Sequence, residues 1–208
     1  MLFGHDWGSM AAYAAALAEP HTVRRLVTTA VPYGPGMFTA LVTNAKQQRR
    51  SWYMFFFQTI LAESSVPMND FALIEDLWRD WSPSYADPSW DLARVRETLS
   101  VPGVLEAALG YYRTAFNPSS KSPALEPLES KIGVEPIAIP SLYLHGAEDG
   151  CVGIDVTQGM EALFPSGLRR VVLEDAGHFL QVEAPDRVTA EILDFLREPS
   201  FVSSAEQR

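Results

Sequence analysis

The hydrophobic and polar positions of the 208-residue chain predict strands that alternate with helices near both ends. Strand patterns rich in β-branched and other apolar residues occur at 24–30, 137–145 and 169–174. Helical patterns occur at about 8–18, 155–163 and 185–197. Strands that alternate with helices predict an α/β fold in which helices cover both faces of a parallel sheet.

The middle of the chain has a different pattern. Helical stretches separated by prolines run at about 44–63, 70–80, 90–98 and 101–116, without a convincing strand. We therefore expect a helical lid, inserted over the carboxyl ends of the strands, where open α/β sheets bind ligands. The predicted organisation is a partial core at 1–35, a lid at 36–130, the rest of the core at 131–198 and a flexible tail at 199–208.

Composition narrows the functional classes. Hydrophobic residues make up 47% of the chain, and the net charge of −10 argues against nucleic acid or an anionic membrane surface as partner. The single cysteine, Cys151, excludes an internal disulfide and fits a reducing cytoplasm. Its apolar runs are too short to span a bilayer, and no Cys/His spacing indicates a metal. We expect a cytoplasmic protein without a cofactor.

Asp6 is at the centre of the most informative motif, Gly4-His5-Asp6-Trp7-Gly8. The spacing is that of a nucleophile elbow, a sharp strand-to-helix turn that exposes its central side chain. Small residues on both sides let the backbone make this turn. An aspartate in that position attacks carbon by displacement and becomes an ester.

Two further residues complete a catalytic order. Asp149 and His178 each follow a predicted strand, as Asp6 does, so all three side chains can converge at one end of the sheet. His178 can take a proton from the water that hydrolyses the ester, and Asp149 can orient its ring. Glu148 is the alternative acid. The backbone amide of Trp7 is a candidate oxyanion donor.

Other reactive side chains have simpler interpretations. We expect Ser9 to begin a helix, His5 to bond locally, His145 to be a satisfied histidine at a strand end, and Cys151 to be an inert thiol. The basic run 46–50 is typical of a solvated helix face rather than a nucleic-acid site.

These motifs resemble the epoxide hydrolase and haloalkane dehalogenase branch of the α/β-hydrolase superfamily. The resemblance lies in Gly-His-Asp-Trp-Gly, in His-Gly-x-x-Asp, and in Ala-Gly-His-Phe followed by Glu183-x-Pro185, and extends from residue 2 to about 197. It implies the C-terminal part of an α/β-hydrolase fold with Asp6 as nucleophile, Asp149 as acid and His178 as base. It also implies a hydrolase that consumes water, and the aromatic lid indicates a small apolar organic substrate.

The lid bears on the choice of substrate. In soluble epoxide hydrolases, which this region resembles, two lid tyrosines donate hydrogen bonds to the epoxide oxygen. Tyr112 matches the second position, whereas Phe56, which has no hydroxyl, stands at the first. Tyr53, three residues earlier, can substitute for it; alternatively, Tyr53 and its aromatic neighbours simply line an apolar pocket. A dehalogenase would instead need halide donors such as Trp7 and Trp52.

Members of this family carry several strands before the elbow, whereas only Leu2 and Phe3 precede it here. We therefore expect this chain to be an incomplete reading of a longer protein, with the second oxyanion donor outside it. An epoxide hydrolase-like enzyme is the leading hypothesis. The alternatives are a haloalkane dehalogenase-like hydrolase and a truncated, inactive remnant.

Overall fold

The computed structural model describes residues 1–198, so the predicted tail at 199–208 lies outside the described residues. Its centre is a four-stranded sheet in the order β1-β2-β3-β4, with every neighbouring pair parallel. The strands are β1 (Leu2–His5), β2 (Leu26–Thr29), β3 (Ser141–Gly146) and β4 (Leu168–Leu173). The two predicted core segments thus build one sheet, which confirms the expected α/β class.

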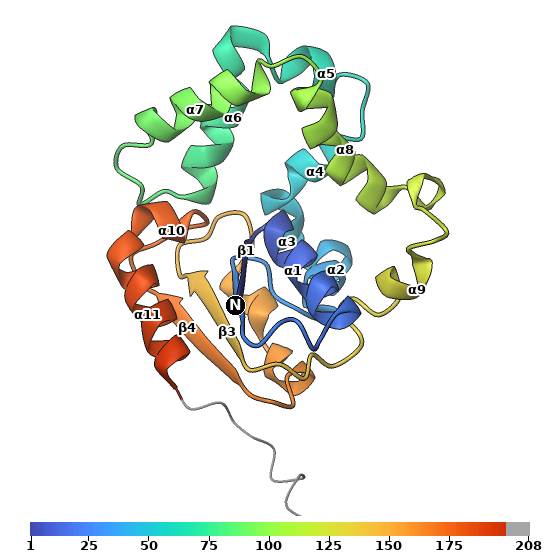
Figure 1. Ribbon diagram of the computed structural model, residues 1–208. Helices are drawn as coiled ribbons and strands as arrows, with labels where there is room; N and C mark the ends of the chain where they lie inside the picture. Colours follow the sequence, from blue (N-terminus) through green and yellow to red (C-terminus); the bar gives the residue numbers. More distant parts are fainter. Residues whose placement is uncertain (199–208) are drawn as a thin grey trace, which may run out of the picture.

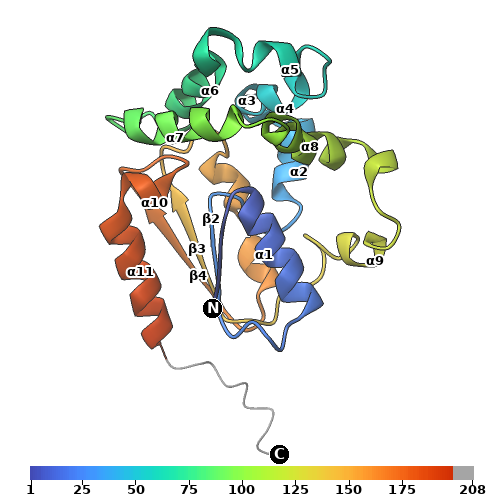
Figure 2. The same ribbon diagram turned by 45° about the horizontal axis from the view of Figure 1, so that its top comes forward.

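Helices cover both faces of this sheet (Figure 2). They are α1 (Trp7–Ala18) on one face and α11 (Pro185–Arg197), preceded by α10 (Leu180–Glu183), on the other. Successive side chains of a strand point to opposite faces. Accordingly, Tyr143 of β3 packs with Tyr13 of α1, whereas its neighbour Leu142 packs with Phe195 of α11. A strand with both faces covered is buried along its whole length, as β3 is.

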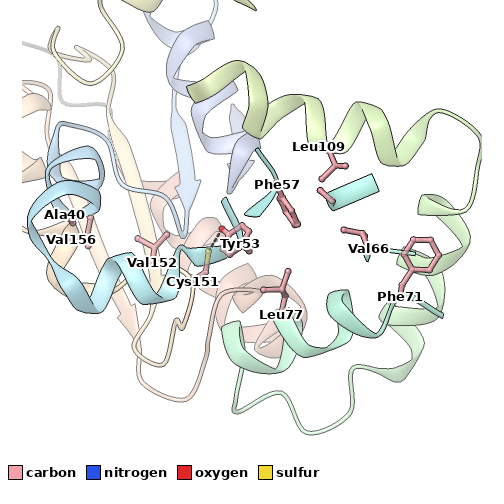
Figure 3. Packing of buried hydrophobic residues seen from close by; sticks show 11 residues of the cluster. Ala40, Tyr53, Phe57, Val66, Phe71, Leu77, Leu109, Cys151, Val152 and Val156 are labelled. Carbon is pink, nitrogen blue, oxygen red and sulfur yellow. Dashed lines mark hydrogen bonds between the residues drawn. The ribbon is translucent and has the colours of Figure 1, made fainter. Parts of the chain in front are cut away.

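Residues 36–130 form most of the connection between β2 and β3, and we call them the lid segment. Its elements are α2 (Gly36–Thr43), α3 (Ala45–Arg50), α4 (Trp52–Phe56), α5 (Ala62–Ser65), α6 (Met68–Trp81), α7 (Ser89–Leu99), α8 (Val104–Phe116), η1 (Pro118–Ser120) and α9 (Glu126–Glu129). Helices α4 to α8 lie together beyond the carboxyl ends of the strands (Figure 1). They enclose a hydrophobic cluster that includes Phe57, Leu77 and Leu109 (Figure 3). Cys151 and Val152, from the loop after β3, join the same cluster.

Some predicted elements are shorter or divided. The helix expected at 44–63 is broken into α3, α4 and α5; the Asn44 side chain caps the first of these by accepting from two backbone N–H groups. The strand expected at 137–145 begins only after Pro140, which has no N–H to donate to the sheet. The helix expected at 155–163 is two 3₁₀ turns, η2 (Ile154–Thr157) and η3 (Met160–Leu163), separated by the left-handed Gly159.

Across residues 1–198, none of the helices has both the length and the hydrophobicity that a membrane crossing requires.

Candidate active site

Asp6 lies in a strained turn between β1 and α1. Its φ of 51° and ψ of −120° are unusual for a residue other than glycine. A Cβ added to Gly4 would lie 2.2 Å from the carbonyl oxygen of Gly8, whereas one added to Gly8 would meet nothing within 4 Å. The expected need for small residues on both sides therefore holds only at Gly4. The buried Ser9 hydroxyl bonds the carbonyls of Gly4 and Thr29, at 2.9 and 2.8 Å, and so fixes the turn to β2.

Asp6, Asp149 and His178 meet at the carboxyl end of the sheet, each in the loop after a strand. The Nε2 atom of His178 lies 3.5 Å from a carboxylate oxygen of Asp6. Its Nδ1 atom lies 3.0 Å from Oδ2 of Asp149. One imidazole ring therefore bridges two carboxylates. Glu148, the alternative acid, is exposed, and the structure places Asp149 rather than Glu148 against the ring.

The loop after β3 fixes the orientation of Asp149. Its Oδ1 atom accepts the backbone N–H groups of Cys151 and Val152 at 2.7 and 2.8 Å. Oδ2 is thereby left for His178. Since a carboxylate only accepts hydrogen bonds, Nδ1 of His178 must carry a proton and Nε2 faces Asp6.

Electrostatics favours an ion pair in the resting site. Burial by itself lowers the pKa of His178, but Cys151, Asp149 and Asp6 raise it to well above its ordinary value. Burial likewise raises the pKa of Asp6, but His178, His5 and the backbone N–H of Trp7 bring it below its ordinary value. Asp6 and His178 therefore stabilise each other's charged forms, a carboxylate and an imidazolium.

Two other histidines, His5 and His145, form hydrogen bonds around the site, but neither bridges Asp6 and Asp149. Nε2 of His5 donates to the backbone carbonyl of His178 at 3.0 Å, so its bond is long-range rather than local as expected. Burial, with the charge of His178, lowers the pKa of His5 to about 4 and keeps it neutral. His145 is buried between the Tyr143 hydroxyl, at 2.7 Å, and the Val152 carbonyl, at 3.1 Å, as expected of a satisfied histidine.

The end of α6 is bonded to the two loops that carry Asp149 and His178. The carbonyl oxygen of Trp81 accepts the N–H groups of Gly150 and His178, at 3.1 and 3.0 Å. Ser82 donates to Glu183 at 2.6 Å, and the same carboxylate accepts the N–H of the residue before His178 at 2.8 Å. The sequence does not predict these positioning contacts, because the pattern of residue types does not show where a backbone carbonyl will accept a hydrogen bond. In the sequence, Glu183 stands out only as part of a motif.

Asp6 lines a pocket of about 390 Å³, a size suited to a small organic molecule. Apart from Asp6 the wall is mostly apolar and includes Trp7, Val31, Met37, Phe38, Tyr53 and Val152. The pocket therefore places the Asp6 carboxylate against a mostly apolar wall.

Two of the predicted lid residues lie close to Asp6. Tyr53 is buried in the wall of the pocket, with its hydroxyl 3.2 Å from the sulfur of Cys151 (Figure 3). Tyr112 lines an adjacent cavity of about 170 Å³ inside the lid segment. Its ring meets the rings of Tyr53 and Trp7 edge-on, with centroids 5.7 and 5.4 Å apart. Burial raises the pKa of Tyr112, and the charge of Asp6 raises it further.

Trp52 and Phe56 lie elsewhere, which corrects their expected place in the lid pocket. Trp52 is 42% exposed and lines a different pocket, beside Arg49 and Arg50. Phe56 packs against Trp52 and is not part of the wall around Asp6. The reason is helical geometry: positions 52 and 56 share one face of α4, whereas Tyr53 faces inward from another.

Cys151 is part of the site and was not expected there. It is buried, lines the Asp6 pocket, and bonds the Tyr53 hydroxyl. Burial raises the pKa of its thiol. The sequence signal that was available is its position two residues after Asp149, on the loop that must approach His178.

Comparison with known proteins supports the fold. Residues 1–185 match the family described as "alpha/beta hydrolase fold". The chain is 27% identical to human epoxide hydrolase 4 over 205 residues, covering 95% of this chain and 53% of that protein. It is 24% identical to epoxide hydrolase A of Mycobacterium tuberculosis, over 93% of this chain and 67% of that protein. The chain spans about half the length of the first curated relatives it matches.

Solved structures agree with this assignment. A putative epoxide hydrolase from Klebsiella pneumoniae superposes with a TM-score of 0.81 at 21% identity, over 94% of this chain and 66% of that one. An inhibitor complex of the Bacillus megaterium epoxide hydrolase superposes with a TM-score of 0.73 at 23% identity, over 94% and 68% of the two chains. The parallel sheet, the strained turn at Asp6 and these matches together show that the chain belongs to the α/β-hydrolase fold family.

Proposed function

We propose that this chain carries the catalytic machinery of an epoxide hydrolase-like enzyme in which Asp6 is the nucleophile. One observation carries the proposal: His178 lies between the strained Asp6 and a fixed Asp149. Relatives that cover most of this chain are named epoxide hydrolases, which supports the same reaction class. The apolar wall of the pocket favours small apolar substrates.

In the first step, an oxygen of Asp6 attacks an epoxide carbon. The carbon–oxygen bond of the ring breaks, its electron pair goes to the epoxide oxygen, and Asp6 becomes a neutral ester. The developing alkoxide needs a proton donor. Tyr53 and Tyr112 are proposed for this role, because burial raises the pKa of both hydroxyls and keeps them protonated at neutral pH. Tyr53 thus takes the place that Phe56 cannot fill.

The second step needs His178 to act as a base rather than as an acid. Formation of the ester on Asp6 makes this possible. Esterified Asp6 no longer carries the negative charge that helps to raise the pKa of His178. The imidazolium therefore gives up its proton more readily, and this proton returns to the tyrosinate left by the first step. Nε2 then becomes free to take a proton from water. Hydroxide adds to the ester carbonyl, with the amide of Trp7 placed to stabilise the oxyanion. The ester bond then breaks, which releases the diol and regenerates Asp6.

The dehalogenase alternative is less well supported. It requires donors to a departing halide, and the second donor considered for it was Trp52. That side chain lies outside the Asp6 pocket, whereas Trp7 lines it. A single indole leaves the halide without its second donor, so epoxide opening remains the proposed reaction.

The test is to trap the ester. His178→Gln removes the base and should accumulate an adduct after incubation with a panel of small epoxides and haloalkanes. Intact-protein mass should rise by the whole mass of an epoxide, and peptide mapping should place the adduct on Asp6. The matched control, Asp6→Asn, should gain no mass.

Three outcomes would contradict the proposal. Turnover by the unmodified protein without any adduct on His178→Gln would exclude the covalent route. Adducts from haloalkanes alone would favour the dehalogenase. A folded protein that turns over neither class would support a non-catalytic chain.

A further inference from the structure

Three potential metal ligands converge at one point of the site. Asp6, Cys151 and His178 offer a carboxylate oxygen, a sulfur and a ring nitrogen, and these atoms all lie within 4.8 Å of one another. They come from the loops after three different strands, so the fold rather than local sequence brings them together. The proposed hydrolysis uses Asp6 and His178 but has no role for Cys151.

The spacing suits a tetrahedral zinc site. Zinc binds nitrogen and oxygen at about 2.0–2.2 Å and sulfur at about 2.3 Å, which puts neighbouring ligand atoms about 3.3–3.6 Å apart. The separation of 3.5 Å between Nε2 of His178 and the Asp6 oxygen already meets that requirement. The sulfur of Cys151 needs to move by roughly 1 Å to complete the triangle. Figure 3 shows this sulfur beside Tyr53.

The surroundings of His178 also fit a zinc site. Histidines that bind zinc almost always donate their other N–H to a carboxylate or carbonyl, which orients the ring. Here Nδ1 of His178 donates to Asp149 at 3.0 Å, so Nε2 faces Asp6 and Cys151. Asp149 is in turn held by two backbone N–H groups. The Asp6 side chain is 28% exposed, so an ion can reach the site through the pocket.

We propose that Asp6, Cys151 and His178 form a zinc-binding site, and that bound zinc blocks the pocket. The mixture of nitrogen, oxygen and sulfur ligands is one that zinc accepts, with its fourth position left to water. On binding, zinc replaces the thiol proton of Cys151 and the Nε2 proton of His178, and both protons pass to solvent. The ion then occupies the lone pairs that Asp6 and His178 need for chemistry, so zinc and substrate exclude each other.

The experiment measures metal binding without substrate. The full 208-residue chain, freed of metal with a chelator, is titrated with Zn²⁺ by calorimetry and with Co²⁺ by absorbance, where a thiolate ligand gives a charge-transfer band. We expect one ion per chain and a thiolate band. Cys151→Ala should lose the band, and both Cys151→Ala and Asp6→Asn should bind at least about tenfold more weakly. His21→Ala removes an exposed histidine outside the site and should bind as the unmodified chain does.

Equal affinity of Cys151→Ala and the unmodified chain would overturn the proposal, as would a thiolate band that survives that substitution. Loss of binding in His21→Ala alone would show an adventitious surface ion and would also overturn it. Asp6→Asn is nearly isosteric, and circular dichroism of each variant separates lost ligands from lost fold. Because binding is measured without turnover, failure of the proposed hydrolysis leaves this result unaffected, and the reverse also holds.

Discussion

Replacement of Asp149 by asparagine separates the position of this side chain from its charge. Oδ1 of Asp149 accepts two backbone N–H groups, from Cys151 and Val152, so the asparagine carbonyl must take that place. Its NH₂ group then faces Nδ1 of His178, where an acceptor used to be. Neutral His178 must therefore hold its proton on Nε2, toward Asp6, and cannot serve as a base there.

The structure also sets the size of the effect. Hydrogen bonds to a charged group contribute about 1.5–3 kcal/mol each and neutral ones about 0.5–1.5, so two weakened bonds cost on the order of 2 kcal/mol of unfolding free energy. Asp149→Ala should cost more, about 3–5 kcal/mol, because it removes one of the two carboxylates beside the buried His178 and leaves two backbone N–H groups without their acceptor. In hydrolases with a Ser-His-Asp triad, a wrong histidine tautomer lowers turnover by about 10⁴-fold, and we expect a loss of that order here.

Two measurements check this reasoning. Nitrogen-15 NMR of Asp149→Asn should show neutral His178 protonated at Nε2 rather than at Nδ1, a result that needs no substrate. Where a substrate is turned over, rapid-quench kinetics should show ester formation followed by stalled hydrolysis. A proton retained on Nδ1, or steady-state turnover within about tenfold of the unmodified protein, would refute the proposed role of Asp149.

Two further predictions follow from the turn at Asp6. Gly4→Ala should lower the unfolding free energy by about 3 kcal/mol in denaturant titrations, because its Cβ would press on the Gly8 carbonyl at 2.2 Å. Gly8→Ala, the matched control, should be neutral or stabilising by up to about 1 kcal/mol, since its Cβ is unhindered and the residue is helical; equal losses at both positions would contradict the packing argument. Asp6→Asn should lose the stabilisation that comes from the ion pair with His178, and the loss should depend on pH. The raised pKa of His178 contributes stability below about pH 6.5 that is lost as pH rises through its folded pKa. The lowered pKa of Asp6 contributes stability above about pH 4 that is lost as pH falls through its folded pKa. The deficit of Asp6→Asn in denaturant unfolding should therefore be greatest between about pH 4 and 6.5; a deficit that stays constant up to pH 10 would show that no such ion pair forms.

Local pattern was enough to predict the architecture. Apolar strands that alternate with helices imply a parallel sheet, and the structure has one. The meeting of Asp6, Asp149 and His178 was predictable for the same reason: each follows a strand, and parallel strands place their carboxyl ends along one edge. Elements divided by a cap or a left-handed residue were harder to predict, as the two 3₁₀ turns on either side of Gly159 show.

The finer features of the site were decided only by tertiary packing. The rotation of α4 about its axis places Tyr53 in the pocket and turns Trp52 and Phe56 away from it. All three residues lie within about one and a half turns of the same helix. The carbonyl of Trp81 accepts hydrogen bonds from the loops of Asp149 and His178, which are far from it in sequence. Cys151 became part of the site because two backbone N–H groups must fold onto Asp149. Sequence by itself determined which residues end up at the edge of the sheet, because topology requires it. Only the packed structure decided which side chains face Asp6, because helix rotation and loop path depend on contacts between residues far apart in the chain.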